Sequence, residues 1–277
     1  MRIGAHISIS GGISKALERA SETGCECMQF FISNPRAWAF PQITGSEITE
    51  FKQLRKEFDI YPLVIHSPYL PNIASPDKHI YQKSIKILKA NIDIAEKINA
   101  DYFVVHPGNY LFDDLQKSIK RVADAVNILN SNSKNIVILI ENTAGQGSEV
   151  GFLFSQLGQM LEKIKNKKRC GVCIDTAHLF AAGYDFTDEL KLKSAITEMS
   201  AFFEISNVKL FHFNDTFVQC GAQRDRHHYI GEGLIGTDSF KNIMNHSLFN
   251  KLAAIIETPE KLDPGHFNAI STIKKIR

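Results

Sequence analysis

The chain has 277 residues, of which 44% are hydrophobic and 22% are charged, and its formal net charge is +2. The hydrophobic fraction excludes a disordered protein, and the small charge argues against a protein that binds nucleic acid through bulk basicity. Every apolar run is far shorter than the roughly 20 residues of a membrane-spanning helix, so we expect no membrane partner. The opening Met1–His6 lacks the features of a secretory signal, which predicts a cytoplasmic protein.

The five cysteines are sparse, and two of them, Cys170 and Cys173, form a CxxC pair. A disulfide framework is not expected in a chain of this size without a secretory signal. The CxxC spacing is also found in redox and zinc sites. However, the pair lies in a strand-like run, whose period of two would point the thiols to opposite faces. We therefore interpret the pair as structural.

Short apolar runs alternate with segments of helical periodicity along the chain. Eight runs are rich in Ile, Val or Phe and show little polar alternation, as expected for strands buried on both faces of a parallel sheet. The predicted strands are Arg2–Ile7, Met28–Ile32, Tyr61–His66, Tyr102–His106, Ile136–Glu141, Gly171–Asp175, Val208–His212 and Ala253–Glu257.

The segments between the runs show the i, i+3/i+4 spacing of helices, for example over 80–98 and 115–129. Thr44 and Glu47 predict a capping box ahead of the helical segment 48–58, and 268–276 predicts a final helix. Eight strand–helix units predict an α/β fold, a single (β/α)8 TIM barrel with one domain over 1–277. A doubly wound open sheet is the alternative, but no Gly-x-Gly-x-x-Gly follows the first strand.

Acidic and imidazole side chains stand at the ends of six consecutive predicted strands. In a TIM barrel, the C-terminal ends of the strands form the active site. The six residues are His66, His106, Glu141, Asp175, His212 and Glu257. A single strand-terminal histidine is usually structural. Six such residues on one rim would place buried charges together, and bound metal cations would neutralise them.

Two further segments add the same chemistry. His178 lies three residues after Asp175, and Asp225 and His227 are two residues apart, so an extended loop would aim both the same way. Nine imidazole and carboxylate ligands suit a cluster of two or three ions. The lack of thiolate favours Zn2+, with Mn2+ or Fe2+ as substitutes. Four carboxylates against three divalent ions leave a surplus of about two positive charges, which suits a phosphodiester substrate.

Three long segments resemble the signature segments of endonuclease IV, the type 2 apurinic/apyrimidinic endonuclease family. They span 139–147, 173–185 and 226–233, and the shorter segments 3–8 and 211–215 are similar too. The resemblance covers essentially the whole chain. It implies a monomeric barrel with three Zn2+ per chain, which acts in base excision repair in a bacterial-type cytosol. The implied reaction cleaves duplex DNA 5′ to an abasic site and leaves a 3′-hydroxyl and a 5′-deoxyribose phosphate.

The resemblance also divides the nine ligands among three ions. It implies His66, His106 and the bridging Glu141 for the first; Glu141, Asp175, His212 and Glu257 for the second; and His178, Asp225 and His227 for the third. Glu141 is implied to lie beside the hydroxide that attacks the phosphorus. Glu257 is the second implied catalytic residue, which orients the attacking group.

Five positions are predicted to contact DNA. The family inserts side chains at the abasic site, and the matching residues here are Arg36, Tyr69 and Leu70. An arginine and an aromatic ring suit the gap left by a missing base, because stacking compensates for unstacking. Asn34 and His6, which follow or end strands on the same rim, are the other two predicted contacts. The alternative for His6 is that it supports the metal ligands from outside their set.

The remaining histidines have simpler interpretations. His228 would face away from His227 on an extended loop, and His79, His246 and His266 lie in or near helices, where we expect surface positions.

Two other functions remain open for the chain. A metal-dependent sugar isomerase or epimerase of the same barrel superfamily would need a mostly carboxylate ligand set. A non-catalytic, metal-stabilised nucleic-acid binder would explain the ligands but not their clustering.

Overall fold

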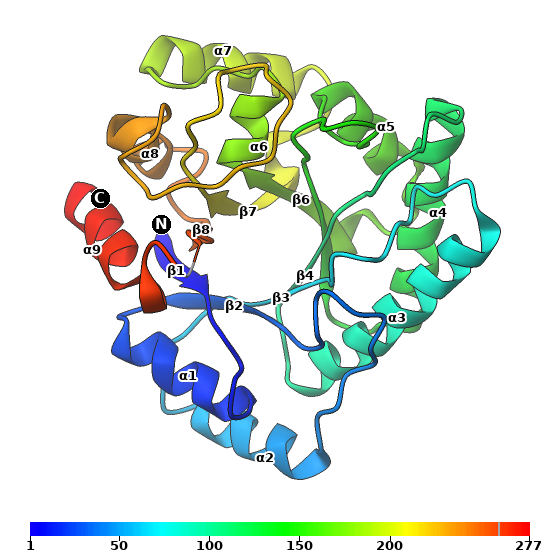
Figure 1. The fold of residues 1–277 in the computed structure, drawn as a ribbon, viewed down its shortest axis with the longest axis vertical. Helices are drawn as coiled ribbons and strands as arrows, with labels where there is room; N and C mark the ends of the chain where they lie inside the picture. The colour runs from blue at the N-terminus through cyan, green and yellow to red at the C-terminus, as the bar shows by residue number, and fades with distance from the viewer. Residues whose placement is uncertain (260) are drawn as a thin grey trace.

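The strands of the described chain close into a parallel barrel, in which each strand pairs with the next and β8 pairs with β1 (Figure 1). The computed structural model describes residues 1–259 and 261–277. The strands are β1 (Arg2–His6), β2 (Cys27–Phe31), β3 (Leu63–His66), β4 (Tyr102–Val105), β5 (Val137–Glu141), β6 (Cys170–Asp175), β7 (Val208–Phe213) and β8 (Ala253–Ile256). The predicted barrel is confirmed, and the open-sheet alternative is wrong.

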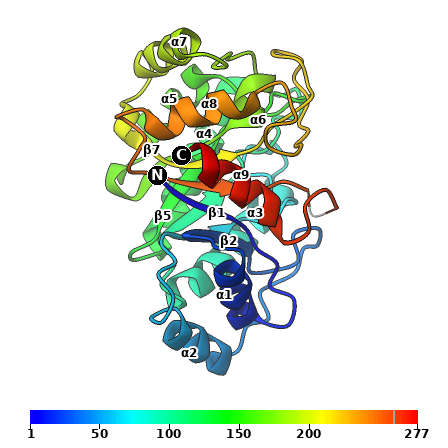
Figure 2. The same cartoon turned by 90° about the vertical axis from the view of Figure 1, so that its left-hand side faces the viewer.

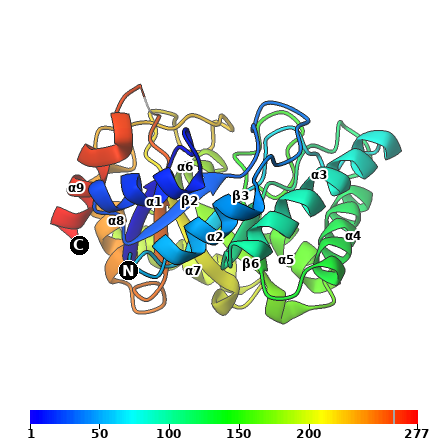
Figure 3. The ribbon, with the colours of Figure 1, turned by 90° about the horizontal axis from the view of Figure 1, so that it is seen from below.

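Helices surround the barrel on its outside (Figure 1, Figure 2). They are α1 (Ile13–Glu22), α2 (Gly45–Leu54), α3 (Lys78–Lys97), α4 (Leu115–Asn132), α5 (Phe154–Lys163), α6 (Thr176–Ala181), α7 (Glu189–Ser200), α8 (Gly236–Asn245) and α9 (Phe267–Ile276), with short 3-10 turns η1 (Lys167–Arg169), η2 (Ile205–Asn207) and η3 (Pro264–His266). Figure 3 shows α1 and α2 on the near side of the barrel, with α3 to their right. Within the described ranges, no helix has both the length and the apolar character needed to cross a membrane.

The strand bounds differ from the predicted ones by one or two residues. β3 begins at Leu63, after Pro62, whose nitrogen has no hydrogen to donate to a ladder. β4 and β8 end one residue before His106 and Glu257, while β7 continues one residue past His212. All the predicted strand-end residues therefore still lie at the C-terminal rim of the barrel.

Local sequence signals explain how individual elements begin. The predicted capping box is present at α2, where Thr44 Oγ1 accepts the N–H of Glu47 and Glu47 Oε2 accepts the N–H of Thr44 at 2.8 Å.

The two cysteines of the CxxC pair lie in different apolar layers. Cys173 belongs to the apolar cluster inside the barrel, whereas Cys170 belongs to the layer between strands and helices. The CxxC thiols thus face opposite sides of β6, as the strand period predicts.

Candidate metal centre

The first group of ligands joins three neighbouring strands. His66 Nε2 and His106 Nε2 lie 3.2 Å and 3.0 Å from the same oxygen of Glu141, Oε2. On its other side, the His66 ring places Nδ1 2.7 Å from the carbonyl oxygen of Ser67. This contact assigns the ring proton to Nδ1 and leaves Nε2 to face the cluster, as outer contacts do for metal-bound histidines.

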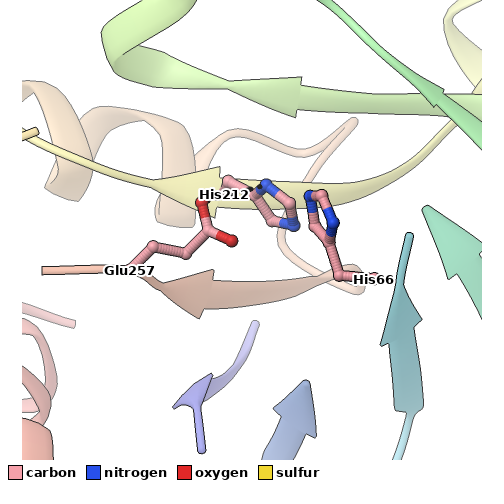
Figure 4. Close-up of side chains that lie close together, drawn as sticks. All are labelled: His66, His212 and Glu257. Carbon is pink, nitrogen blue, oxygen red and sulfur yellow. Dashed lines mark ion pairs between the residues drawn. The ribbon is translucent and has the colours of Figure 1, made fainter. Parts of the chain in front are cut away.

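The second group lies across the barrel mouth. His212 Nδ1 is 2.9 Å from Glu141 Oε1 and 3.3 Å from Glu257 Oε2. With Asp175, these residues offer four ligand atoms that all lie within 4.8 Å of one another. Figure 4 shows His212 and Glu257 directed toward one another, with His66 beside them. Glu141 contributes to both groups, which is the position of a bridging carboxylate.

The third group combines the end of β6 with the loop that follows β7. Asp175, His178 and His227 offer ligand atoms within 4.8 Å of one another. Asp225 Oδ1 lies 3.2 Å from His178 Nε2 and 3.4 Å from His227 Nε2. The structure therefore brings all nine predicted ligands together and also places Asp175 beside the third group. His227 Nε2 is buried without a hydrogen-bond partner among the described residues, which fits a site for a cation.

Buried charges dominate the electrostatics of the cluster. Burial favours the neutral form of Glu141, but the imidazoles of His106 and His212 outweigh it and hold its pKa well below the ordinary value. Burial also opposes a charge on His178, but Asp175 and Asp225 hold its pKa well above the ordinary value. These carboxylates thus require positive charge beside them, and protons or divalent cations supply it. A set of imidazole and carboxylate donors without thiolate fits Zn2+.

Two buried asparagines support the ligands, and the sequence analysis missed both. Asn142 Oδ1 accepts the N–H of Asp175 at 2.7 Å, and the Asn142 carbonyl oxygen lies 3.0 Å from His178 Nδ1. Asn214 Nδ2 donates to Asp175 Oδ2 at 2.6 Å and to Glu257 Oε2 at 3.1 Å. The sequence does contain one indication of both: Asn142 directly follows the ligand Glu141, and Asn214 lies two residues after the ligand His212.

Asp215 is another buried residue that sequence analysis missed. Its carboxylate accepts backbone N–H groups from four residues of the loop that carries Asp225 and His227 and from the first residue of α8; they are Thr216, Gly231, Gly233, Ile235 and Gly236. A Cβ on Gly233 would lie 2.2 Å from Asp215 Oδ1, so this approach requires glycine. The loop that supplies the third group is therefore organised around one carboxylate.

A groove of about 1410 Å³ opens over the cluster, and His6, Asn34, Arg36 and Tyr69 are among its lining residues. Tyr69 and Leu70 are 59% and 38% exposed at the rim. Partial burial, with the carboxylates of Glu257 and Glu141, raises the pKa of Tyr69 to about 12, so its hydroxyl stays neutral. Four of the five predicted DNA contacts thus line the groove, and Leu70 adjoins it in the chain.

The other histidines lie outside the cluster, with one correction to the sequence analysis. His266 is buried, and its Nε2 lies 2.9 Å from the carbonyl oxygen of His6, so the expected surface position is wrong. The reason is that η3 folds this segment against the end of β1. His228 packs against Phe217 with ring centroids 4.0 Å apart, away from the three ligand groups.

Comparisons with known proteins give a consistent result. A family model described as a xylose isomerase-like TIM barrel matches residues 17–276. Probable endonuclease 4 of Halothermothrix orenii is 41% identical over 261 residues, which cover 94% of each protein. The crystal structure of endonuclease IV from Thermus thermophilus has a TM-score of 0.87 and 27% identity, and the match covers 100% of this chain and 98% of that chain. A D-tagatose 3-epimerase-like protein (TM-score 0.78, 17% identity, 100% of this chain and 97% of that chain) shares the fold alone.

Proposed function

The chain belongs to the endonuclease IV family, and we propose that it is a zinc-dependent DNA repair endonuclease that hydrolyses the phosphodiester 5′ to abasic sites in duplex DNA. The products are a 3′-hydroxyl and a 5′-deoxyribose phosphate, as base excision repair requires. In this proposal residues 1–277 form one endonuclease domain, which acts as a monomer in the cytoplasm.

One observation carries the proposal. Nine imidazole and carboxylate side chains converge beneath a groove and seven of them line it, and Glu141 lies between the imidazoles of His106 and His212. Charges of this kind are costly to bury unless cations accompany them. With three divalent cations bound, the four carboxylates would leave the cluster a surplus of about two positive charges. Such a cluster at the bottom of a groove is a suitable place for a DNA phosphate, although the chain as a whole is nearly neutral.

The proposed centre holds three Zn2+ per chain. We assign His66, His106 and Glu141 to the first site; Glu141, Asp175, His212 and Glu257 to the second; and His178, Asp225 and His227 to the third. When bound, such ions stabilise charge on the phosphate and activate water at neutral pH. Mn2+ or Fe2+ would satisfy the same donors.

Glu141 and Glu257 are the proposed catalytic residues. Glu141 is buried and joins the first two groups, so it fixes the floor of the site on which the scissile phosphate would rest. Glu257 is 16% exposed and faces the groove, where its carboxylate can accept a hydrogen bond from the attacking water and orient it toward phosphorus. Gln29 and Asn214 each donate to one oxygen of Glu257 and limit its rotation.

Recognition of the abasic site is assigned to the rim of the groove. Arg36, Tyr69 and Leu70 would enter the base stack, where an aromatic face and a guanidinium replace the stacking of the missing base. Asn34 and His6 would contact the sugar–phosphate backbone beside them. The exposure of Tyr69 and Leu70 leaves both available for insertion.

The direct test is a nicking assay on a duplex with one abasic site, combined with metal analysis of the purified protein. We expect about three zinc ions per chain and cleavage of the abasic strand only. Glu141→Ala should lose nicking and bound zinc together, whereas Glu198→Ala, on the exposed face of α7, should lose neither. Retention of both properties by Glu141→Ala would overturn the assignment, and turnover of a ketose without DNA cleavage would favour an epimerase.

A further inference from the structure

Gln29 is a fully buried side chain on β2 whose amide reaches two ligands of the centre, His212 and Glu257, and also His6 beside them. Its Oε1 lies 2.9 Å from His212 Nε2, and its Nε2 lies 2.7 Å from Glu257 Oε1. The same Nε2 lies 3.1 Å from His6 Nδ1. Both ends of the amide are therefore engaged beneath the second ligand group.

His212 presents a different ring nitrogen from the other cluster histidines. His66, His106 and His178 direct Nε2 at a carboxylate of the cluster; the atoms are 3.2, 3.0 and 3.2 Å apart. His212 instead directs Nδ1 at Glu141 and Nε2 at Gln29. An amide oxygen only accepts, so the proton must sit on His212 Nε2, and a neutral ring then offers its Nδ1 lone pair to a cation.

We propose that Gln29 is a positioning residue that fixes His212 in the Nε2–H tautomer and holds Glu257 from the opposite side of the same amide. This role rests on the metal centre of the proposed function. Glutamine meets both requirements, because it offers an acceptor to His212 and a donor to Glu257 without adding charge to a group of buried carboxylates. A glutamate would lack the donor, and an aliphatic side chain would lack both groups.

The test compares two matched deletions of a buried amide, Gln29→Met and Gln156→Met. Gln156 lies on α5, where its Oε1 accepts the N–H of Gly151. Chelator competition on the zinc-loaded chains should show a loss of about 10- to 100-fold in affinity at one site for Gln29→Met, the range seen when outer contacts of metal ligands are removed. Gln156→Met should bind zinc as the wild type does.

A second readout follows the proton itself. In ¹⁵N NMR of the zinc-loaded protein, the wild type and Gln156→Met should show a slowly exchanging Nε2–H of His212, assigned by its absence in His212→Gln. Gln29→Met should lose this signal. Gln29→Glu keeps an acceptor on a side chain of the same length, so it should retain the Nε2–H signal while binding zinc more weakly. If Gln29→Met does not fold, Gln29→Glu is the variant that tests the role of Gln29.

Either of two results in Gln29→Met overturns this role for Gln29: wild-type zinc affinity, or an unchanged His212 Nε2–H signal. For Gln29→Glu, loss of the signal with unchanged zinc affinity does the same. A wild-type chain that binds no zinc overturns the metal centre itself and the role of Gln29 with it, so the two failures are distinguishable.

Discussion

The backbone N–H of Tyr69 donates a hydrogen bond of 3.0 Å to the carbonyl oxygen of Pro35. This bond joins the loop after β3 to the loop after β2, next to Arg36. Tyr69 also packs edge-on against Phe31 at the end of β2, with ring centroids 5.2 Å apart. The three side chains proposed to enter the DNA stack, Arg36, Tyr69 and Leu70, are therefore presented by one connected pair of loops.

We expect Tyr69→Ala to weaken binding of abasic duplex by about 10-fold or more, because stacking on an aromatic ring contributes ~1–3 kcal/mol per base. Single-turnover titration gives the affinity and the cleavage rate separately, and the zinc content should not change. Tyr61→Ala is the matched control, since Tyr61 is 53% exposed and lies just before β3, at the other end of the barrel. Equal affinities of Tyr69→Ala and wild type would contradict this use of the tyrosine.

Removal of Asp215 should destabilise the chain and loosen the loop after β7. Asp215→Ala leaves five backbone N–H groups without their acceptor, and we expect a loss of about 3 kcal/mol or more in the free energy of unfolding. Urea unfolding measures the loss, and limited proteolysis within 216–235 should become faster. Asp188→Ala removes a cap of α7 that accepts one N–H and should cost only about 1 kcal/mol. Similar losses in the two variants would refute the anchoring role.

Much of the site could be predicted from the sequence because parallel strands bring their C-terminal ends to one rim. His66, Glu141 and Asp175 could be grouped for that reason alone. Closure of the barrel between β8 and β1 could not be read from strand count, because an open sheet uses the same runs.

Gln29 and Asp215 had no recurring sequence pattern to reveal them. Gln29 is one amide in the apolar strand Cys27–Phe31, and only the folded barrel places it under His212. The role of Asp215 depends on the path of a loop whose conformation no periodicity describes. His266 was wrongly expected at the surface because its burial depends on η3, and the sequence analysis did not predict that turn.

Stability should depend on pH through Glu96, which is remote from the metal centre. Its Oε1 accepts the N–H groups of Lys134, Asn135 and Ile136 at 2.8, 2.9 and 3.0 Å, ahead of β5. Burial opposes its charge, but these bonds and Arg169 outweigh burial and hold the pKa of Glu96 below its ordinary value.

A lowered pKa in the folded state means that ionised Glu96 stabilises the fold above the unfolded pKa of about 4.3. This contribution is lost as pH falls through the lower folded value. We therefore expect Glu96→Gln to be less stable than wild type at pH 7, by about 1–3 kcal/mol, and the difference to shrink in acid. Urea unfolding of both chains across this range measures it. A difference that stays constant with pH would show that the charge of Glu96 contributes nothing.

Asp225→Ala should remove one ligand from the third group and leave the first two intact. We expect bound zinc to fall from about three to about two per chain. Loss of a residue that only supports a metal ligand typically lowers activity by about 10- to 100-fold, and loss of a ligand itself should lower nicking by at least as much. Asp238→Ala, an exposed carboxylate in the first turn of α8, is the control and should change neither quantity. Full zinc content in Asp225→Ala would remove this residue from the ligand set.

The central claim is that the zinc-loaded chain cuts the DNA backbone on the 5′ side of an abasic site. The most direct measurement is end-group analysis of a labelled duplex with one abasic site after incubation with the zinc-loaded protein. We predict a single cut that leaves a 3′-hydroxyl, extendable by a DNA polymerase, and a 5′-deoxyribose phosphate. An uncut duplex, or a cut on the 3′ side of the site, would contradict the account.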